Sequence, residues 1–325
     1  MSDNTWEGDF RSRRHALKAM GAGVLSIAGL GAGARSQASQ TVRIQHALGV
    51  TVVPSAPQRV ITLFQGATDT AVSLGVTPVG VVESWTEKPV YAYLRPALEG
   101  VAQVGLETQP SLEDIVSLEP DLIVASRFRN ERIYSLLSRI APTIALNDVF
   151  SFEASLDLMA RAFGKVSQAD AVRAQWAARV SSLRASLARA YAPQWPLTVS
   201  VLDFREDHVR AYLPNSFSGN VLAQLGFGRT PYQADSGQTL QKITSREAIP
   251  FLNAQIMFVL MRSDRPSVRR NYLAWREHPL WATLDAPQSQ RVYEVDNVAW
   301  SLSGGVLGAH LMLDDISRQL ALPAC

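Results

Sequence analysis

Cysteine is almost absent from this sequence of 325 residues, since the single cysteine is Cys325, the last residue. No disulfide can form within the chain, and no cysteine cluster can hold a metal. The histidines beyond the first forty residues are His46, His208, His278 and His310, and no two have the helical spacing of a zinc site. A Gly-x-Ser-x-Gly elbow and a P-loop are also missing. We therefore predict that the protein is not an enzyme and has no intrinsic cofactor.

An excess of charge of one sign is missing too. Lysine and arginine together number 31 and aspartate and glutamate 29, which gives a formal net charge of +2. A nucleic-acid-binding protein presents a basic face, so this balance argues against such a partner. Beyond residue 40 no segment approaches the roughly 18 consecutive apolar residues of a membrane-spanning helix. We expect neither a nucleic-acid partner nor a membrane span in the mature protein.

The first forty residues have the features of an export signal. Residues 12–18 read Ser-Arg-Arg-His-Ala-Leu-Lys, a twin-arginine pattern, and residues 19–34 are mostly small and apolar. Small-x-small cleavage sites end at Ala34 and, as an alternative, at Ala38. We interpret residues 1–34 as a twin-arginine signal peptide, the alternative being a chance arginine pair before a helix. Because no cysteine at either site could carry a lipid, we expect a soluble periplasmic protein without a lipid anchor.

From residue 41 onward, short strands alternate with helices. Apolar runs that predict strands occur at 59–63, 79–82, 121–125, 197–203 and 256–261. Helix patterns occur at 67–74, 111–119, 219–225 and 305–320. Ser111 can cap the second helix, Pro120 stops it, and Gly226 closes the third. Continuous apolar strands alternating with helices are typical of a parallel sheet covered on both faces, so the sequence predicts an α/β fold.

One segment interrupts this alternation. Between Ala169 and Tyr191 apolar residues recur every three or four positions, at Val172, Trp176, Val180, Leu183 and Leu187. The spacing predicts one helix of about 23 residues, roughly 35 Å long. We therefore predict two α/β halves bridged by this helix; a single continuous sheet with the helix as a crossover is the alternative. The predicted divisions are an N-terminal lobe at 41–150, a helical segment at 151–192 and a C-terminal lobe at 193–325.

Six motifs, spread over nearly all of the mature chain, resemble one known family. In chain order they are Val104–Glu113 with Leu118–Ala125, Ile140–Thr143, Pro214–Gly219, Ser245–Glu247, Pro279–Trp281 and Val292–Asp296. They resemble the binding proteins that serve ABC importers of ferric siderophores and cobalamin, most closely the ferric-dicitrate and ferric-hydroxamate members. The resemblance implies two Rossmann-like α/β lobes joined by one long rigid helix, with the ligand in a cleft between them.

The resemblance also implies a function. The protein would capture a ferric siderophore, or a ferric-carboxylate chelate, and deliver it as a monomer to an ABC-importer permease at the inner membrane. The chelator would hold the iron, so no protein metal ligand is expected. Haem or cobalamin binding is an alternative, with Tyr91, Tyr93 or Tyr232 as a haem ligand. A twin-arginine-exported metalloenzyme with a site built from distant residues is a further alternative.

Two glutamates match family positions that pair with transporter arginines, one on each lobe: Glu113 and Glu247. Each also has a purely structural interpretation. Glu113 lies in the first turn of a predicted helix, where a carboxylate stabilises the helix by roughly 0.3–1 kcal/mol. Glu247 can complete a capping box with Thr244. With the resemblance, we predict that both glutamates dock the transporter through arginine–carboxylate pairs.

A ferric chelate is bulky and often anionic, so its site needs fixed cations and aromatic walls. Three arginines lie just beyond predicted strands, where open α/β sheets bind ligands: Arg129, Arg205 and Arg262. Arg129 also matches an arginine of the ferric-dicitrate members. The aromatic candidates, whose ordinary role is core packing, are Trp85, Tyr93, Tyr212, Tyr232 and Trp300.

The sequence departs from the family at Glu107, where many relatives carry an arginine that faces the ligand. Some relatives also carry a basic residue near Ser303. A carboxylate in place of a cation favours a less charged hydroxamate or mixed chelate over a highly negative one such as ferric dicitrate. Alternatively, Glu107 turns outward or pairs with Arg129. We retain Glu107 as a candidate residue of the cleft.

Overall fold

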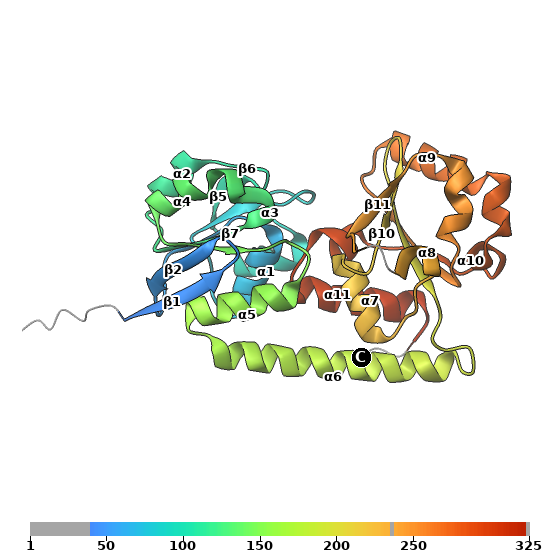
Figure 1. Ribbon diagram of the computed structural model, residues 1–325, viewed down its shortest axis with the longest axis horizontal. Coiled ribbons are helices and arrows are strands. Elements are labelled where there is room, and N and C mark those ends of the chain that lie inside the picture. Colours follow the sequence, from blue (N-terminus) through green and yellow to red (C-terminus); the bar gives the residue numbers. More distant parts are fainter. Residues whose placement is uncertain (1–39, 235–236, 323–325) are drawn as a thin grey trace, which may run out of the picture. The chain divides into compact units, whose positions relative to one another are not determined.

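The computed structural model of the protein describes residues 40–234 and 237–322. The predicted signal peptide lies outside the described residues. Helices alternate with mostly parallel strands, which confirms the predicted α/β class. The strands form an N-terminal hairpin and two larger, separate sheets (Figure 1), so the alternative of one continuous sheet is wrong.

The first large sheet has six strands in the order β6-β5-β4-β3-β7-β8. Its strands are β3 (Val60–Thr62), β4 (Gly80–Glu83), β5 (Ala102–Leu106), β6 (Gln109–Pro110), β7 (Leu122–Ser126) and β8 (Thr143–Leu146). All neighbours are parallel except β5 and β6. The preceding hairpin consists of β1 (Thr41–His46) and β2 (Gly49–Pro54).

The second large sheet has five strands in the order β11-β10-β9-β12-β13. Its strands are β9 (Val199–Phe204), β10 (Val209–Tyr212), β11 (Leu240–Ile243), β12 (Ile256–Met261) and β13 (Val292–Glu294). Strands β9, β12 and β13 are parallel, whereas β10 is antiparallel to both β9 and β11. This sheet is therefore mixed, and its antiparallel edge has no counterpart of equal length in the first sheet.

Continuous apolar strands are explained by burial on both faces of each sheet. In β7, Leu122 and Val124 belong to one buried cluster, whereas Ile123 belongs to another on the opposite face. In β9, Val201 and Leu202 divide in the same way. Successive side chains of a strand point to opposite faces, so a strand covered on both sides has no position for an exposed polar residue.

Helices cover both sheets. Around the first sheet they are α1 (Gln65–Ser73), η1 (Ala92–Ala97), α2 (Leu112–Ser117), α3 (Arg127–Asn130), η2 (Glu131–Ile133), α4 (Tyr134–Ile140) and α5 (Phe152–Phe163). Around the second they are α7 (Phe217–Leu225), α8 (Pro231–Ala234), η3 (Arg246–Leu252), α9 (Pro266–Arg276), η4 (Pro279–Thr283), α10 (Asp285–Gln288), η5 (Val298–Leu302) and α11 (Val306–Gln319). The Ser111 hydroxyl accepts a hydrogen bond from the Asp114 amide and caps α2, as predicted. Gly226 ends α7 with a φ of 89°, a conformation that glycine adopts without strain.

The long helix is α6 (Val166–Ala190), with 25 residues. Its first part, including Ala169, packs in a core of the first sheet. Trp176, Leu183 and Leu187 pack in a core of the second sheet. The Trp176 indole also donates a 2.7 Å hydrogen bond to Gln224 of α7. One apolar stripe thus contacts the cores of both sheets, and α6 runs along both (Figure 1).

Candidate binding cavity

A cavity of about 320 Å³ opens where the carboxyl ends of strands from both sheets meet. We call it the arginine cavity. Residues that follow strands of the first sheet line one wall: Gln65, Gly66, Trp85, Glu107, Phe128, Arg129, Val149 and Phe150. The second sheet and its loops supply the other wall, which includes Arg205, Arg210, Tyr212, Ser216, Ser218, Arg262 and the turn Trp300–Leu302. This is the edge at which open α/β sheets bind ligands.

The structure brings most of the predicted binding residues together in this cavity. Those that line it are Trp85, Glu107, Arg129, Arg205, Tyr212, Arg262 and Trp300. Tyr93 and Tyr232 are absent from the described lining. The three predicted arginines lie together because each follows the carboxyl end of a parallel strand. We call this expectation, that ligands bind at the carboxyl ends of parallel strands, the strand-end rule.

The first wall contains a carboxylate that is already paired. Glu107 is 4% exposed, and its Oε1 accepts a 2.9 Å hydrogen bond from Nε of Arg129. Its Oε2 accepts 3.3 Å hydrogen bonds from the Trp85 indole and from the backbone amide of Gln65, the first residue of α1. Of the alternatives for Glu107, pairing with Arg129 is the one observed. This pairing largely neutralises the single cation of the wall.

Aromatic rings complete the first wall. The Arg129 guanidinium carbon lies 4.6 Å from the centre of the Phe128 ring and 5.6 Å from that of the Trp85 ring. Trp85 is 38% exposed and Phe128 is 54% exposed. Large aromatic surfaces beside a fixed guanidinium can contact an apolar or planar part of a ligand.

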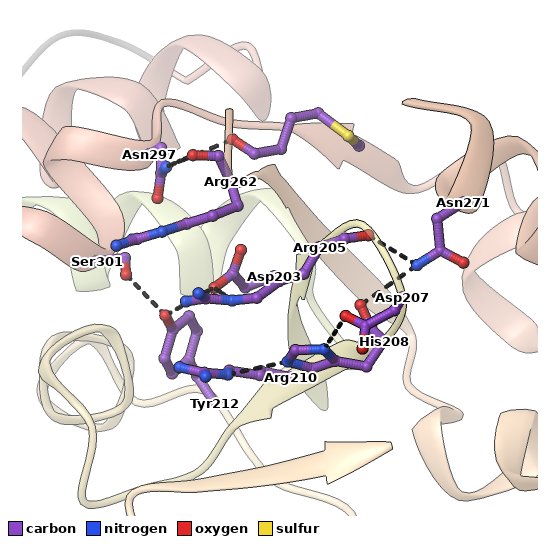
Figure 2. A network of polar contacts seen from close by, with 11 residues as sticks. Asp203, Arg205, Asp207, His208, Arg210, Tyr212, Arg262, Asn271, Asn297 and Ser301 are labelled. Atoms are coloured by element: carbon purple, nitrogen blue, oxygen red, sulfur yellow. Dashed lines mark hydrogen bonds and ion pairs between the residues drawn. The ribbon is translucent and has the colours of Figure 1, made fainter. Parts of the chain in front are cut away.

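The second wall is built around Asp203, which is fully buried at the end of β9. Its Oδ2 accepts hydrogen bonds from Nε and Nη2 of Arg205, at 3.1 and 2.9 Å, and from the Tyr212 hydroxyl at 3.1 Å (Figure 2). The Tyr212 and Ser301 hydroxyls lie 2.8 Å apart. Burial, and then the charge of Asp203, raise the pKa of Tyr212, so its hydroxyl stays a donor. Asp203 therefore fixes Arg205 and Tyr212 in place.

Two further arginines converge on the same wall. Arg210 lies on β10 opposite Asp203, and its Nε donates a 3.3 Å hydrogen bond to His208. The pKa of Arg210 is lowered by burial and by the positive charges of Arg205 and Arg262. Among the described residues, the Arg262 side chain has no hydrogen-bond or ion-pair partner, and Figure 2 shows it pointing toward Ser301. Three mutually repelling cations thus face the cavity.

The sequence reasoning missed Arg210. The rule that placed the other arginines concerns parallel strands, whereas Arg210 lies inside an antiparallel strand. The residues Val209-Arg210-Ala211-Tyr212 alternate in polarity only weakly, because Tyr212 is large and apolar. Recognising a hairpin after β9 would have placed Arg210 opposite Asp203.

A largely buried turn forms the floor of the cavity. Trp300 is fully buried, donates a 2.7 Å hydrogen bond from its indole to Asp315, and packs 4.4 Å from the Phe258 ring. Trp300 therefore lines the cavity mainly as a packing residue. It belongs to the π-helical turn η5, which also supplies Ser301 and Leu302 to the lining.

Behind this floor a buried carboxylate joins α1 to α11. Asp69 of α1 accepts hydrogen bonds from the backbone amides of Leu307 and Gly308, both at 2.9 Å, and from the Tyr93 hydroxyl at 2.8 Å. Burial raises the pKa of Asp69 to about 6, although these hydrogen bonds oppose the shift.

The backbones of α1 and of the turn before α11 also lie close together. A Cβ on Gly66 would lie 2.4 Å from the Gly304 carbonyl oxygen, so only glycine allows α1 to pack this close to Gly304.

The tyrosines expected as alternative haem ligands have other positions. Tyr91 is fully buried, and its hydroxyl lies 3.4 Å from the Leu302 carbonyl oxygen. Tyr93 is bound to Asp69. Tyr232 is 68% exposed and packs its ring 4.9 Å from that of Phe251. None of these hydroxyls reaches the described lining of the arginine cavity.

The two predicted docking glutamates lie on different halves of the protein. Glu113 is exposed in the first turn of α2, and Glu247 is exposed at the start of η3. Neither forms an ion pair within residues 40–234 and 237–322. The capping box with Thr244 is not formed, because Ser245 is the cap and accepts from the Glu247 amide at 3.2 Å.

Within the described part of the chain, no helix has the length and apolar character needed to cross a membrane. No cluster of three or more histidine, cysteine, aspartate or glutamate side chains is placed there to hold a metal ion.

Comparison with known proteins gives consistent matches. The model of a family described as periplasmic binding protein matches residues 60–299. The achromobactin-binding periplasmic protein of Dickeya dadantii is 56% identical over 263 residues, covering 81% of this chain and 86% of its own. The probable siderophore-binding lipoprotein YfiY of Bacillus subtilis is 36% identical, covering 86% of this chain and 87% of its own.

A solved structure matches over most of its length as well. Staphylococcus aureus SirA, crystallised in complex with staphyloferrin B, superposes with a TM-score of 0.84 at 39% sequence identity. The match covers 87% of this chain and 99% of the SirA chain.

Proposed function

This chain belongs to the periplasmic binding protein family, and we propose that it captures a ferric siderophore in the arginine cavity and delivers it to an ABC importer. The observation that carries the proposal is the convergence of Arg205, Arg210 and Arg262 on one wall of a cavity at the strand ends. A chelate that already coordinates its iron needs such fixed donors rather than metal ligands.

The charge of the cavity favours a carboxylate-rich chelate. Four arginines line it against the single carboxylate of Glu107, with Asp203 buried beneath. An anion bound among the arginines of the second wall would relieve their mutual repulsion, and a guanidinium can bind a carboxylate through two parallel hydrogen bonds. The sequence alone, through Glu107, suggested a less charged ligand. Because Arg210 adds a further positive charge to the cavity, we propose a more negatively charged ligand instead.

Polar groups at the start of α7 support the same assignment. Ser216, the N-cap of α7, and Ser218, in its first turn, line the cavity where backbone amides favour negative charge. The buried Ser218 hydroxyl has no hydrogen-bond partner among the described residues. A carboxylate or hydroxyl of the ligand would satisfy this group, which otherwise leaves a desolvated donor unpaired.

A fluorescence titration tests the proposal, because Trp85 lies in the cavity wall. The ligands are ferric staphyloferrin B, ferric achromobactin, ferric citrate, a ferric trihydroxamate, haem and cobalamin. We expect saturable quenching by the carboxylate-containing chelates and none by haem or cobalamin. Tight binding of haem with a Soret shift, and no response to any ferric chelate, would contradict the proposal.

We propose that Glu113 and Glu247 dock the permease by pairing with its arginines. Their exposure on different halves, and their lack of ion pairs within the described residues, support this role. The double charge reversal Glu113→Arg and Glu247→Arg should leave the ligand dissociation constant unchanged and abolish uptake. Matched reversals at two other exposed glutamates, Glu99→Arg and Glu277→Arg, should leave uptake intact. Uptake that survives the first pair would remove the docking assignment.

We further propose that residues 41–150 and 193–325 act as two lobes bridged by 151–192. Because α6 packs against cores of both sheets, ligand binding would narrow the cleft only slightly.

We also propose that the protein is a monomer, that it is exported by the twin-arginine route, and that it carries no lipid anchor. Replacing Arg13 and Arg14 by lysine should retain the unprocessed protein in the cytoplasm; continued export would contradict this route.

A further inference from the structure

A second hollow of about 760 Å³, which we call the outer hollow, adjoins the arginine cavity. The two share Phe128 and Phe150, whose ring centres lie 5.6 Å apart. Asn147 and Asp148 contribute from the loop after β8, and Asn215 and Asn220 contribute from the start of α7. The outer hollow is therefore lined by both halves of the protein.

The two hollows differ in charge. Four arginines and one glutamate line the arginine cavity, whereas one arginine and two carboxylates, Arg127, Glu131 and Asp148, line the outer hollow. Arg127 pairs with Glu131 at 3.2 Å. Oδ1 of Asp148 accepts hydrogen bonds from the backbone amides of Phe150 and Ser151, at 2.8 and 3.3 Å. No uncompensated cation lines the described part of the outer hollow, so it offers an anion little attraction.

Unpaired amides make the outer hollow receptive to hydrogen-bonding groups. Among the described residues, the side chains of Asn215 and Asn220 have no hydrogen-bond partner. Asn220 is half-buried on α7, a helix whose first turn also reaches the arginine cavity. Each amide can both donate and accept. These groups suit hydroxyl, amide or amine groups of a ligand.

The arginine cavity is small for a ligand of siderophore size. Small-molecule sites span roughly 300–1,000 Å³, so the arginine cavity, at about 320 Å³, lies at the small end of that range. A siderophore must surround an octahedral ferric ion with several donor groups and the linkers between them. A chelate of this size would extend past Phe128 and Phe150 into the outer hollow.

We propose that the outer hollow is a second subsite that binds an uncharged or cationic polar arm of the ligand, while the arginine cavity binds its carboxylates. The inference rests on the proposed function and narrows the class of ligand. The transported chelate has carboxylates at one end and a hydroxyl-, amide- or amine-bearing extension at the other. A compact chelate such as ferric citrate would occupy the arginine cavity alone.

Filling the outer hollow tests this subsite. Asn220→Trp places a large ring in the hollow, and Ala223→Trp places the same ring on an exposed position of α7 outside the described lining. The probes are ferric staphyloferrin B, ferric achromobactin and ferric citrate, measured by isothermal titration calorimetry. We expect Asn220→Trp to weaken siderophore binding at least tenfold and to change ferric citrate binding less than twofold. Ala223→Trp should change neither, and thermal melts of both variants check folding.

The outcomes separate the two proposals. If the unmodified protein binds none of the ferric probes, the proposed function fails. If it binds a siderophore and Asn220→Trp binds that siderophore equally well, only the second subsite fails. Asn147→Lys adds a cation to the outer hollow as an independent test of arm charge. Tighter siderophore binding by this variant would mean an anionic arm and would overturn the proposal, whereas equal or weaker binding supports it.

Discussion

The two walls of the arginine cavity occupy equivalent places in their sheets but differ in chemistry. In the first wall, Arg129 is paired with Glu107 and lies against aromatic rings. In the second wall, Arg205, Arg210 and Arg262 surround one buried carboxylate, Asp203. We infer that the second wall selects for ligand charge, whereas the first supplies shape and aromatic contact.

The difference arises from the strands. The first sheet ends its parallel strands in short loops and helices, so each strand contributes one or two residues to the cavity. In the second sheet, β9 returns at once as the antiparallel β10, which places Arg210 and Tyr212 opposite residues of β9. The hairpin thereby adds the polar side chains of Arg210 and Tyr212 to the edge at which Arg205 follows β9.

The largest loss of ligand affinity is expected when two cations of the second wall are removed. The variant Arg210→Ala with Arg262→Ala should weaken binding of a ferric carboxylate chelate at least about hundredfold, since each hydrogen bond to a charged group contributes roughly 1.5–3 kcal/mol. Calorimetry gives the dissociation constant directly. Arg139→Ala with Arg276→Ala removes two exposed arginines that line neither the arginine cavity nor the outer hollow, and serves as the control. Equal losses in both variants would mean that the second wall has no special role.

A free-energy change of comparable size is expected for Asp69, this time in the stability of the protein. Asp69 joins α1, at the first wall, to α11 behind the floor. Its pKa in the folded protein, about 6, exceeds the ordinary value of 3.8, because burial disfavours the charged form. The folded state therefore binds this proton more tightly than the unfolded state does. The resulting stability is fully present below about pH 4 and is lost as the pH rises through 6, by about 3 kcal/mol.

The variant Asp69→Asn isolates this contribution. Asparagine cannot ionise, so the free energy of unfolding of the variant should lack the loss that the unmodified protein shows between pH 4 and 7. Chemical denaturation across this range measures the difference between the two proteins, in which the other titrating groups cancel. Parallel pH profiles would show that Asp69 titrates in the folded protein as it does in the unfolded chain.

The sequence predicted those features that depend on local pattern and on the general rule for parallel strands. The helix stripe from Val172 to Leu187 predicted α6, and the strand-end rule brought Arg129, Arg205 and Arg262 to one cavity. It could not decide what Glu107 contacts, because β4 and β3 separate β5, which precedes Glu107, from β7, which precedes Arg129. A contact across two intervening strands depends on the length and direction of the side chains, which the hydrophobic periodicity of the sequence does not predict.

Tyr93 and Trp300 illustrate a second limit. Both are aromatic residues near predicted cavity segments, yet Tyr93 binds the buried Asp69 and Trp300 binds the buried Asp315. Neither carboxylate stood out in the sequence, because a buried aspartate on an amphipathic helix looks like an exposed one. The polar end of an aromatic side chain usually finds a partner when buried, but that partner is set by tertiary packing.

The smallest expected effect comes from the first wall. Arg129→Ala should weaken binding of a ferric carboxylate chelate about tenfold, or 1.4 kcal/mol, because it leaves Glu107 as an uncompensated negative charge in the cavity. Glu107→Gln keeps acceptor capacity for Arg129 and removes the charge, so it should tighten binding a few-fold. In the double variant the affinity should return close to that of the unmodified protein, as measured by calorimetry.

This cycle distinguishes a direct ligand contact from compensation within the wall. If Arg129 acts mainly by neutralising Glu107, the two changes are strongly non-additive, as expected for residues in contact. If Arg129 instead binds the ligand directly, the double variant should bind as weakly as Arg129→Ala alone. The second result would make the two walls alike, with an arginine on each gripping the chelate, and the division of charge and shape between them would be wrong.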